Sequence, residues 1–243
     1  VSKFRIVMCC TFFLVLAIVC LKGCAMSTEY RQPRFRLPQG AADLILVRHG
    51  ETEAARPGVS FAMKDGHGDP VLHPDGEVQA VQVAARLNVE PIQAIYVTKL
   101  RRTHQTAAPL AAALGLAPIE NPDLHEVHLG DWDGGLYRIK AAQNDPAFQR
   151  AFERQEWGEI PGAETTASVQ TRVRRGLLNI GAAHPDETVV VVVHGGVIAA
   201  AMAVASGAEP FAFRGAENGS ISRLVVQNER MTVRGFNDCT HLG

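Results

Sequence analysis

The sequence predicts an α/β fold, a three-layer α/β/α sandwich with a mostly parallel sheet and an antiparallel edge. Short, uninterrupted apolar runs suit strands that are buried on both faces. Segments with helical spacing of apolar residues separate these runs, and such alternation is typical of a sheet covered by helices. A hairpin pattern near the end of the chain indicates the antiparallel edge. With 243 residues, 47% of them apolar, the chain is long enough for one good-sized domain.

The expected strands differ in how clearly the sequence marks them. Residues 43–47 (DLILV) and 94–97 (AIYV) are short apolar runs, and residues 188–193 contain five consecutive valines. Residues 221–226 and 231–234 flank the polar segment QNER, which is typical of a hairpin turn. The first three strands are therefore expected inside the sheet and the last two at its edge.

Four stretches between the strands have helical patterns. The first follows an acidic opening with glycine (DGE), the second is rich in Ala and Leu and ends at Gly115, and the last is rich in alanine. The expected helices are residues 78–87, 102–114, 163–183 and 195–205. Because each helix follows or precedes a strand, functional side chains are expected at the carboxyl ends of the strands.

Residues 1–24 have the composition of an export signal. Lys3 and Arg5 give a basic start, and residues 6–21 are uncharged and mostly Val, Ile, Leu and Phe. An uncleaved membrane anchor is the main alternative, but this apolar run is shorter than the roughly 20 residues that a spanning helix needs. A misassigned start codon is a further alternative.

The residues after the apolar run resemble a bacterial lipoprotein signal. They read LKGCA, and the resemblance implies that Cys24 is lipidated and becomes the new N-terminus. Lys22 departs from the pattern, since a small or hydroxyl residue is usual there. We therefore expect a signal segment at 1–24, a tether at 25–42 and a catalytic domain at 43–243. The domain is expected outside the cytoplasm, attached to the bacterial cell membrane through the lipid.

Charge and cysteine content exclude several classes of function. Lys+Arg is 24 and Asp+Glu is 25, a formal net charge of -1, which argues against nucleic acid as a partner. Of the five cysteines, only Cys239 lies beyond residue 24, and no Cys/His spacing in the body is typical of a zinc site. The domain is therefore expected to depend on its core, without disulfides.

Histidines and arginines follow three of the expected strands. Residues 48–52 (RHGET) come directly after the first strand, residues 98–107 (TKLRRTHQTA) after the second, and residues 194–196 (HGG) after the valine strand. Each motif alone is a modest signal. Because parallel strands end at the same edge of a sheet, the three motifs together predict one site.

These residue types suit phosphoryl transfer. Arginine carries a permanent charge on a planar fork that matches phosphate oxygens. A neutral imidazole is a competent nucleophile near neutral pH and divides hydrolysis into two easier steps. A carboxylic acid then protonates the leaving oxygen, and its conjugate base activates water.

The motifs resemble those of the histidine phosphatase superfamily, the phosphoglycerate-mutase-like enzymes. The most specific match is LVRHGET at residues 46–52, in which the triplet Arg-His-Gly ends the first strand. Further matches are residues 100–107, the acidic segment LHEVHLGDWDG at 124–134, PGAET at 161–165 and VHGGVI at 193–198. The resemblance runs from about residue 43 to about residue 227 and implies a phosphoglycerate-mutase-like fold.

The resemblance also implies a role for each site residue. His49 attacks phosphorus and becomes phosphohistidine, while Arg48, Arg102 and His194 hold the phosphoryl oxygens. Glu126 is the general acid and base. No metal and no organic cofactor is implied, and the partner is a phosphorylated substrate, expected to be a small molecule. Arg102 is preferred to its neighbour Arg101 because its spacing to the QTA motif fits.

Rival interpretations remain open. His125 and His128 flank Glu126 and suggest a weak metal site, against which ordinary loop histidines are preferred. The segment at 53–57 (EAARP) lacks the Trp-Asn pair expected of a mutase, so hydrolysis is preferred to phosphoglycerate-mutase-type transfer. A non-catalytic phosphate-binding module of the envelope is a further alternative. Residues 135–162 are expected to cover the pocket and set specificity, whereas the substrate itself and the oligomeric state are not predicted.

Overall fold

The computed structural model describes residues 29–243. The expected signal segment, with Cys24, lies outside the described residues. Two compact units divide the chain, Val1–Phe35 and Arg36–Gly243. The described part of the first unit, residues 29–35, contains no helix or strand. Among the helices that the structure describes, none is both long and apolar enough to cross a membrane.

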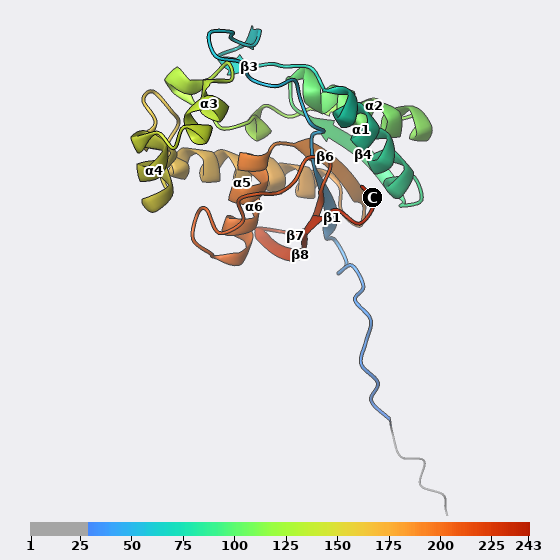
Figure 1. Ribbon diagram of the computed structural model, residues 1–243. Helices are drawn as coiled ribbons and strands as arrows, with labels where there is room; N and C mark the ends of the chain where they lie inside the picture. The colour runs from blue at the N-terminus through green and yellow to red at the C-terminus, as the bar shows by residue number, and fades with distance from the viewer. Residues whose placement is uncertain (1–28) are drawn as a thin grey trace, which may run out of the picture. The chain divides into compact units, whose positions relative to one another are not determined.

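The second unit is built on a mixed six-stranded sheet whose strand order is β5-β4-β6-β1-β7-β8 (Figure 1). The strands are β1 (Ala42–Arg48), β4 (Ile92–Val97), β5 (Ile119–Glu120), β6 (Thr188–Val193), β7 (Ile221–Gln227) and β8 (Arg230–Asp238). The four strands β5, β4, β6 and β1 run parallel, and β7 and β8 pair antiparallel at one edge. The predicted fold class is confirmed.

The register of the two central strands places the two histidine motifs side by side. Strand β1 pairs with β6 from Asp43 opposite Thr188 to Arg48 opposite Val193, so both strands end level. All six residues of β6 are buried, as expected for a strand covered on both faces. The residues that follow, His49 and His194, are therefore neighbours.

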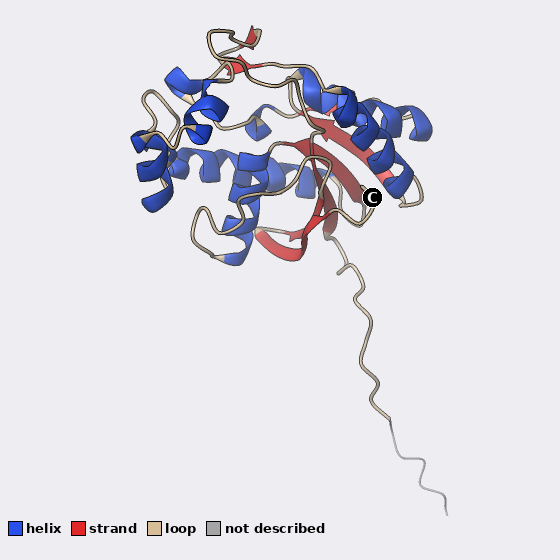
Figure 2. Ribbon diagram, viewed as in Figure 1, coloured by secondary structure: helices blue, strands red, loops and turns tan. Residues whose placement is uncertain are grey.

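Helices cover both faces of the sheet (Figure 2). On one face α1 (Pro74–Leu87) and α2 (Arg101–Leu114) pack over Ile45 and Val47 of β1. On the other face α5 (Thr166–Ala183) and α6 (Gly195–Ser206) pack over Leu44 and Leu46. Alternate residues of one strand thus pack into two separate hydrophobic cores, one on each face of the sheet. This is the physical basis of the three layers.

Several observed elements differ from the expectation in their bounds. Helix α5 begins at Thr166, three residues later than expected, because the Thr165 side chain accepts a hydrogen bond from the Ser168 N–H and caps the helix. Strand β8 continues to Asp238, past the expected end at residue 234. Strand β5 was not expected, since its two residues are exposed and form no apolar run.

The segment between β5 and α5 forms a separate wall made of short helices. It contains α3 (Leu136–Ala142), α4 (Pro146–Glu153) and the 3-10 turns η1 (Pro122–Leu124), η2 (Gly130–Trp132) and η3 (Trp157–Glu159). A two-stranded ribbon of β2 (Met63–Lys64) and β3 (His67–Gly68) lies in the loop after β1. Aromatic contacts among Tyr137, Phe148 and Trp157 bind the short helices together.

Candidate active site

His49 directly follows β1, and the fold fixes its ring in one orientation. Its side chain is buried, and Nδ1 lies 2.8 Å from the Gly50 carbonyl oxygen. A carbonyl only accepts, so Nδ1 carries the hydrogen and Nε2 keeps the lone pair. The His49 N–H donates to the Val193 carbonyl at 3.0 Å, and its own carbonyl accepts from the Asn218 amide at 2.9 Å.

The loop that holds His49 packs directly on the start of α1. A Cβ on Gly50 would lie 2.5 Å from the Gly76 carbonyl oxygen, and a Cβ on Gly76 would lie 2.0 Å from the Glu51 carbonyl oxygen. Two backbones approach at a distance that only glycine permits. The helix thereby fixes the height of His49 above the sheet.

His194 follows β6 and lies fully buried beside His49. The two ring centroids are 5.2 Å apart in an edge-on arrangement. His194 Nε2 lies 3.0 Å from the Thr98 hydroxyl, at the end of β4, while Nδ1 is buried with no hydrogen-bond partner among the described residues. An unpartnered buried nitrogen beside His49 is suited to a ligand oxygen.

Two arginines complete a cationic cluster around His49. Arg48 donates from Nη1 to the Ala216 carbonyl at 2.5 Å, and its buried Nε has no partner in the described residues. Arg102 is buried and donates from Nη1 to the Gly68 carbonyl at 2.9 Å. Burial lowers the pKa of Arg102 to about 10, so the group stays charged at neutral pH. Arg101 instead forms an ion pair with Asp69.

Glu126 reaches the cluster from the loop after η1. Its main-chain oxygen lies 3.2 Å from His67 Nε2 and accepts from Arg172 at 3.2 Å, which fixes the backbone. Its carboxylate accepts from the Val127 N–H at 2.9 Å. A Cβ on Gly196 would lie 2.6 Å from the Glu126 Oε1 atom, so the glycine at the start of α6 leaves the space in which the carboxylate sits.

The surroundings keep both histidines uncharged. Burial, followed by the charges of Arg102 and Arg48, lowers the pKa of His49 well below 6.5. Burial also lowers the pKa of His194, with Arg102 as the next cause. At neutral pH the His49 ring is therefore neutral, with its Nε2 lone pair available, in a strongly cationic setting.

A cavity of about 320 Å³ opens over this cluster. His49, Arg48, Arg102 and Glu126 line it at one end. Four aromatic side chains are among the other lining residues, Phe61, Trp132, Tyr137 and Trp157. A more open cavity of about 630 Å³ adjoins it and shares Arg48 and Arg138. Residues 135–162 contribute Gly135, Tyr137, Arg138 and Trp157 to the first cavity, as expected of the segment that covers the pocket.

Three cavity or support residues were missed from the sequence. Arg138 donates to the Glu53 carbonyl at 2.9 Å and to the Thr52 hydroxyl at 2.6 Å, and Arg214 stacks over Phe152. Neither arginine belongs to a motif, and α3 reads as an ordinary mixed helix. His67, which belongs to none of the motifs, is buried and supports the Glu126 backbone.

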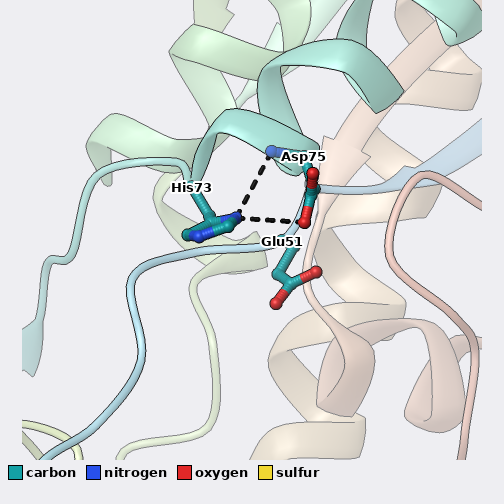
Figure 3. Close-up of side chains that lie close together, drawn as sticks. All are labelled: Glu51, His73 and Asp75. Carbon is teal, nitrogen blue, oxygen red and sulfur yellow. Dashed lines mark hydrogen bonds and ion pairs between the residues drawn. The ribbon is translucent and has the colours of Figure 1, made fainter.

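One group of side chains in residues 29–243 has the spacing of metal ligands. The ligand atoms of Glu51, His73 and Asp75 lie within 4.8 Å of one another (Figure 3). His73 is the N-cap of α1, where its Nδ1 accepts from the Asp75 N–H at 3.3 Å, and the two carboxylates are exposed. The arrangement is explained by capping. His125 and His128 pack against the His67 ring instead of converging on a shared point.

Comparison with known proteins places this site in a family. The family model of the histidine phosphatase superfamily (branch 1) matches residues 44–239. Phosphoserine phosphatase 1 of Hydrogenobacter thermophilus is 33% identical over 202 residues, which cover 82% of this chain and 94% of that protein. Phosphoglycerate mutase-like protein 4 of Arabidopsis thaliana is 34% identical over 210 residues, 83% of this chain and 87% of that protein.

A solved structure agrees with the sequence relatives. The native structure of a mycobacterial glucosyl-3-phosphoglycerate phosphatase superposes with a TM-score of 0.67 at 30% identity, over 81% of this chain and 99% of that one. Family model, relatives and structure thus coincide on the region that carries His49, Glu126 and His194. The chain belongs to the histidine phosphatase superfamily, and the prediction that it is a phosphatase enzyme is confirmed.

Proposed function

We propose that the protein hydrolyses phosphomonoesters through a phosphohistidine intermediate on His49. The observation that carries the proposal is the state of the His49 ring. Its Nδ1 is engaged with a carbonyl, its pKa is lowered by burial, and Arg48 and Arg102 lie around it without carboxylate partners among the described residues. A neutral nucleophile beside two guanidiniums that form no ion pair within the described residues suits a phosphoryl group.

The first step forms an N–P bond and breaks a P–O bond. His49 Nε2 attacks phosphorus, and the protonated Glu126 carboxyl gives its proton to the leaving oxygen. Arg48 and Arg102 bind the phosphoryl oxygens, with His194 Nδ1 beside them. The two guanidiniums offset the charge that spreads over these oxygens in the transition state.

The second step returns the enzyme to its starting state. The Glu126 carboxylate takes a proton from water, the water oxygen attacks phosphorus, and the N–P bond breaks to release inorganic phosphate. His49 is again neutral and Glu126 again protonated, so atoms and charges balance over the cycle. Neither step calls for a metal or an organic cofactor.

The substrate class follows in part from the size of the cavity. A cavity of about 320 Å³ lies at the small end of the range for ligand pockets. A phosphorylated metabolite suits this volume better than a phosphoprotein or a long lipid. Relatives named for phosphoserine and glucosyl-3-phosphoglycerate also point to small phosphomonoesters.

Phosphoryl transfer of the mutase type is the second candidate, because one relative is named phosphoglycerate mutase-like. Hydrolysis is preferred, since the loop after Thr52 reads EAARP and lacks the Trp-Asn pair expected of mutases. A non-catalytic phosphate-binding module would retain binding without turnover. Product analysis separates the three, because only hydrolysis yields inorganic phosphate in proportion to substrate consumed.

We also propose that the domain is exported and held at the bacterial membrane by lipid on Cys24. The support is the basic start, the apolar run and the LKGCA segment. Detergent phase partitioning of cells that express the wild-type chain and Cys24→Ser tests this. Wild type in the detergent phase and the variant outside it are expected. Equal partitioning of the two proteins would contradict lipidation.

The deciding experiment measures phosphate release from an aryl phosphate by the full chain between pH 5 and 8, with and without EDTA. We expect EDTA-resistant turnover and an acid-labile phosphoenzyme. His49→Asn is expected to lower kcat by at least about 10³-fold and to abolish labelling. His104→Asn, on the exposed side of α2, is the matched control. Turnover that survives in His49→Asn would rule out the proposed nucleophile.

A further inference from the structure

Arg214 lies in the same cavity as the catalytic cluster but outside every motif of the family. It belongs to the loop between α6 and β7. Its guanidinium carbon lies 3.5 Å from the centre of the Phe152 ring, 5.4 Å from that of Phe211 and 5.9 Å from that of Trp157. One Nη2 atom lies 3.5 Å from the Tyr137 hydroxyl. The aromatic rings hold the planar group in place at the cavity lining.

The arginines of the described residues fall into two groups according to their partners. Those that are at least partly buried outside the cavity form ion pairs, Arg172 with Glu164, Arg174 with Glu229 and Arg223 with Asp43. Those that are at least partly buried and line the cavity have no carboxylate within ion-pair distance in residues 29–243, and they are Arg48, Arg102 and Arg214. Removing a charge from water without a partner is costly. An anionic ligand would supply the partner that the protein does not.

The neighbours that affect the pKa of Arg214 differ from those that affect the pKa of His49. Burial lowers the Arg214 pKa, and Tyr137 is the one charged or titratable neighbour that acts on it. The His49 pKa, by contrast, is affected by Arg102, Arg48 and Arg138. Its guanidinium stacks on Phe152 of α4, whereas His49 and His194 follow the ends of β1 and β6, so Arg214 suits a different part of the ligand.

Tyr137 relates Arg214 to the general acid. The Tyr137 pKa is raised by burial, and it is affected by both Arg214 and Glu126. Tyr137, Glu126 and Arg214 all line the cavity, and the Tyr137 hydroxyl lies 3.5 Å from Arg214 Nη2. The leaving part of a substrate, which extends from phosphorus past Glu126, would reach Arg214 along the aromatic wall.

We propose that Arg214 binds a carboxylate on the leaving part of the substrate, so that the preferred substrates are small phosphomonoesters that also carry a carboxylate. The proposal rests on the proposed function. A single guanidinium matches the single charge and planar fork of a carboxylate. The phosphoryl end, by contrast, offers two guanidiniums and a histidine for a more highly charged group. The aromatic wall between the two ends accommodates a short carbon chain.

The test compares substrates that differ only in the carboxylate. O-phosphoserine and O-phosphoethanolamine form one such pair, and 3-phosphoglycerate and glycerol 3-phosphate form a second. The full chain in detergent-containing buffer is assayed as wild type, Arg214→Gln and Arg214→Lys. Arg174→Gln is the matched control, because it removes an arginine charge far from the cavity.

Wild type is expected to prefer the carboxylated member of each pair. Arg214→Gln is expected to lower kcat/KM for that member by about 10- to 100-fold, mainly through KM, and to change the other member by less than about twofold. Arg214→Lys is expected to recover part of the loss, since it restores the charge without the fork. Arg174→Gln is expected to behave as wild type.

Other outcomes overturn the inference. Equal losses for both members of a pair would mean that Arg214 only holds the loop. Greater loss with a bisphosphate than with a carboxylate would assign the site to a second phosphate. Binding to the inert His49→Asn variant, measured by calorimetry, separates the two proposals. If no substrate turns over, a carboxylate preference in binding that disappears on Arg214→Gln still supports this site, and equal binding contradicts it.

Discussion

The two sides of the cavity are built in different ways. The phosphoryl side stands on the ends of β1, β4 and β6, where His49 and His194 follow paired strands in strict register. The other side is formed by short helices and loops from two distant segments, which meet through aromatic contacts such as Trp157 with Phe211. One side is positioned by hydrogen bonds between strands, and the other by the packing of side chains.

This difference separates chemistry from selectivity. A register shift in β1 or β6 would turn every side chain to the opposite face, so the position of His49 cannot change without loss of the core. A change in α3, α4 or the loop with Arg214 leaves that register intact. Substitutions on the strand side are therefore expected to affect kcat for every substrate. Substitutions on the loop side are expected to affect KM for some substrates and not for others.

Glu126 is the sharpest test of this comparison, because it belongs to the proposed chemistry although a loop, and not a strand end, holds it. Glu126→Gln keeps the acceptor for the Val127 N–H and removes the acidic proton. We expect kcat to fall by about 10²- to 10⁴-fold for alkyl phosphates, and by less for aryl phosphates, whose leaving oxygen needs little protonation. Steady-state assays with a series of leaving groups of different pKa measure this.

The dependence on leaving group is the decisive readout for Glu126. If Glu126→Gln lowered kcat equally for all leaving groups, the carboxyl group would not be the acid. Asp131→Asn is the matched control, since Asp131 is an exposed carboxylate of the same loop.

Gly196 follows strand β6 and lies against the loop residue Glu126, so its substitution tests how the strand side positions a group on the loop side. A Cβ at this position would lie 2.6 Å from the Glu126 Oε1 atom and 2.7 Å from the Val127 side chain. Gly196→Ala therefore displaces the carboxylate without removing it, and a displacement of this kind costs up to about 100-fold in kcat. The measurement is kcat beside the melting temperature.

Ala200→Gly, in the same helix, controls for helix stability. A Gly196→Ala protein that melts like wild type and keeps full activity would show that the Glu126 carboxylate is free to move. The inference that the first turn of α6 fixes the position of the Glu126 carboxylate would then be wrong.

The strand side could be predicted from the sequence, and the loop side could not. Runs such as 188–193 are recognisable alone, and parallel strands that end together bring His49 and His194 to one edge without further information. Arg102 was preferred to Arg101 because of its spacing to the QTA motif, and because successive helical residues point about 100° apart, so that one site is not expected to use both. These inferences depend on local pattern and topology.

The residues that were missed depend on contacts between distant segments. Arg214 and Phe152 are far apart in the sequence, and no periodicity relates them. The burial of His67 follows from its contact with Glu126, which is 59 residues away, and no local pattern marks it. The two residues of strand β5 are exposed and helix α3 has no buried residue, so neither element carries an apolar pattern that marks it in the sequence. The general location of a pocket wall at 135–162 was predictable, but the individual contacts were not.

The smallest expected effect concerns stability, and it compares the two sides directly. Burial lowers the pKa of His49, on the strand side, well below 6.5, and burial lowers that of His125, on the loop side, to about 4. Between these values and 6.5 the unfolded chain binds more protons than the folded chain. The contribution of these two histidines to the free energy of unfolding is therefore fully present above about pH 6.5. It is lost as the pH falls below that value.

From pH 6.5 to 5, one fully buried histidine contributes a loss of about 2 kcal/mol, and the partly exposed His125 contributes about 1 kcal/mol. Urea unfolding at pH 7 and pH 5 measures the difference for wild type, His49→Asn and His125→Gln. The loss between the two pH values is expected to shrink by the larger amount in His49→Asn and by the smaller amount in His125→Gln. An unchanged loss in His49→Asn would mean that His49 is protonated in the folded protein, and it would remove the neutral nucleophile on which the strand side depends.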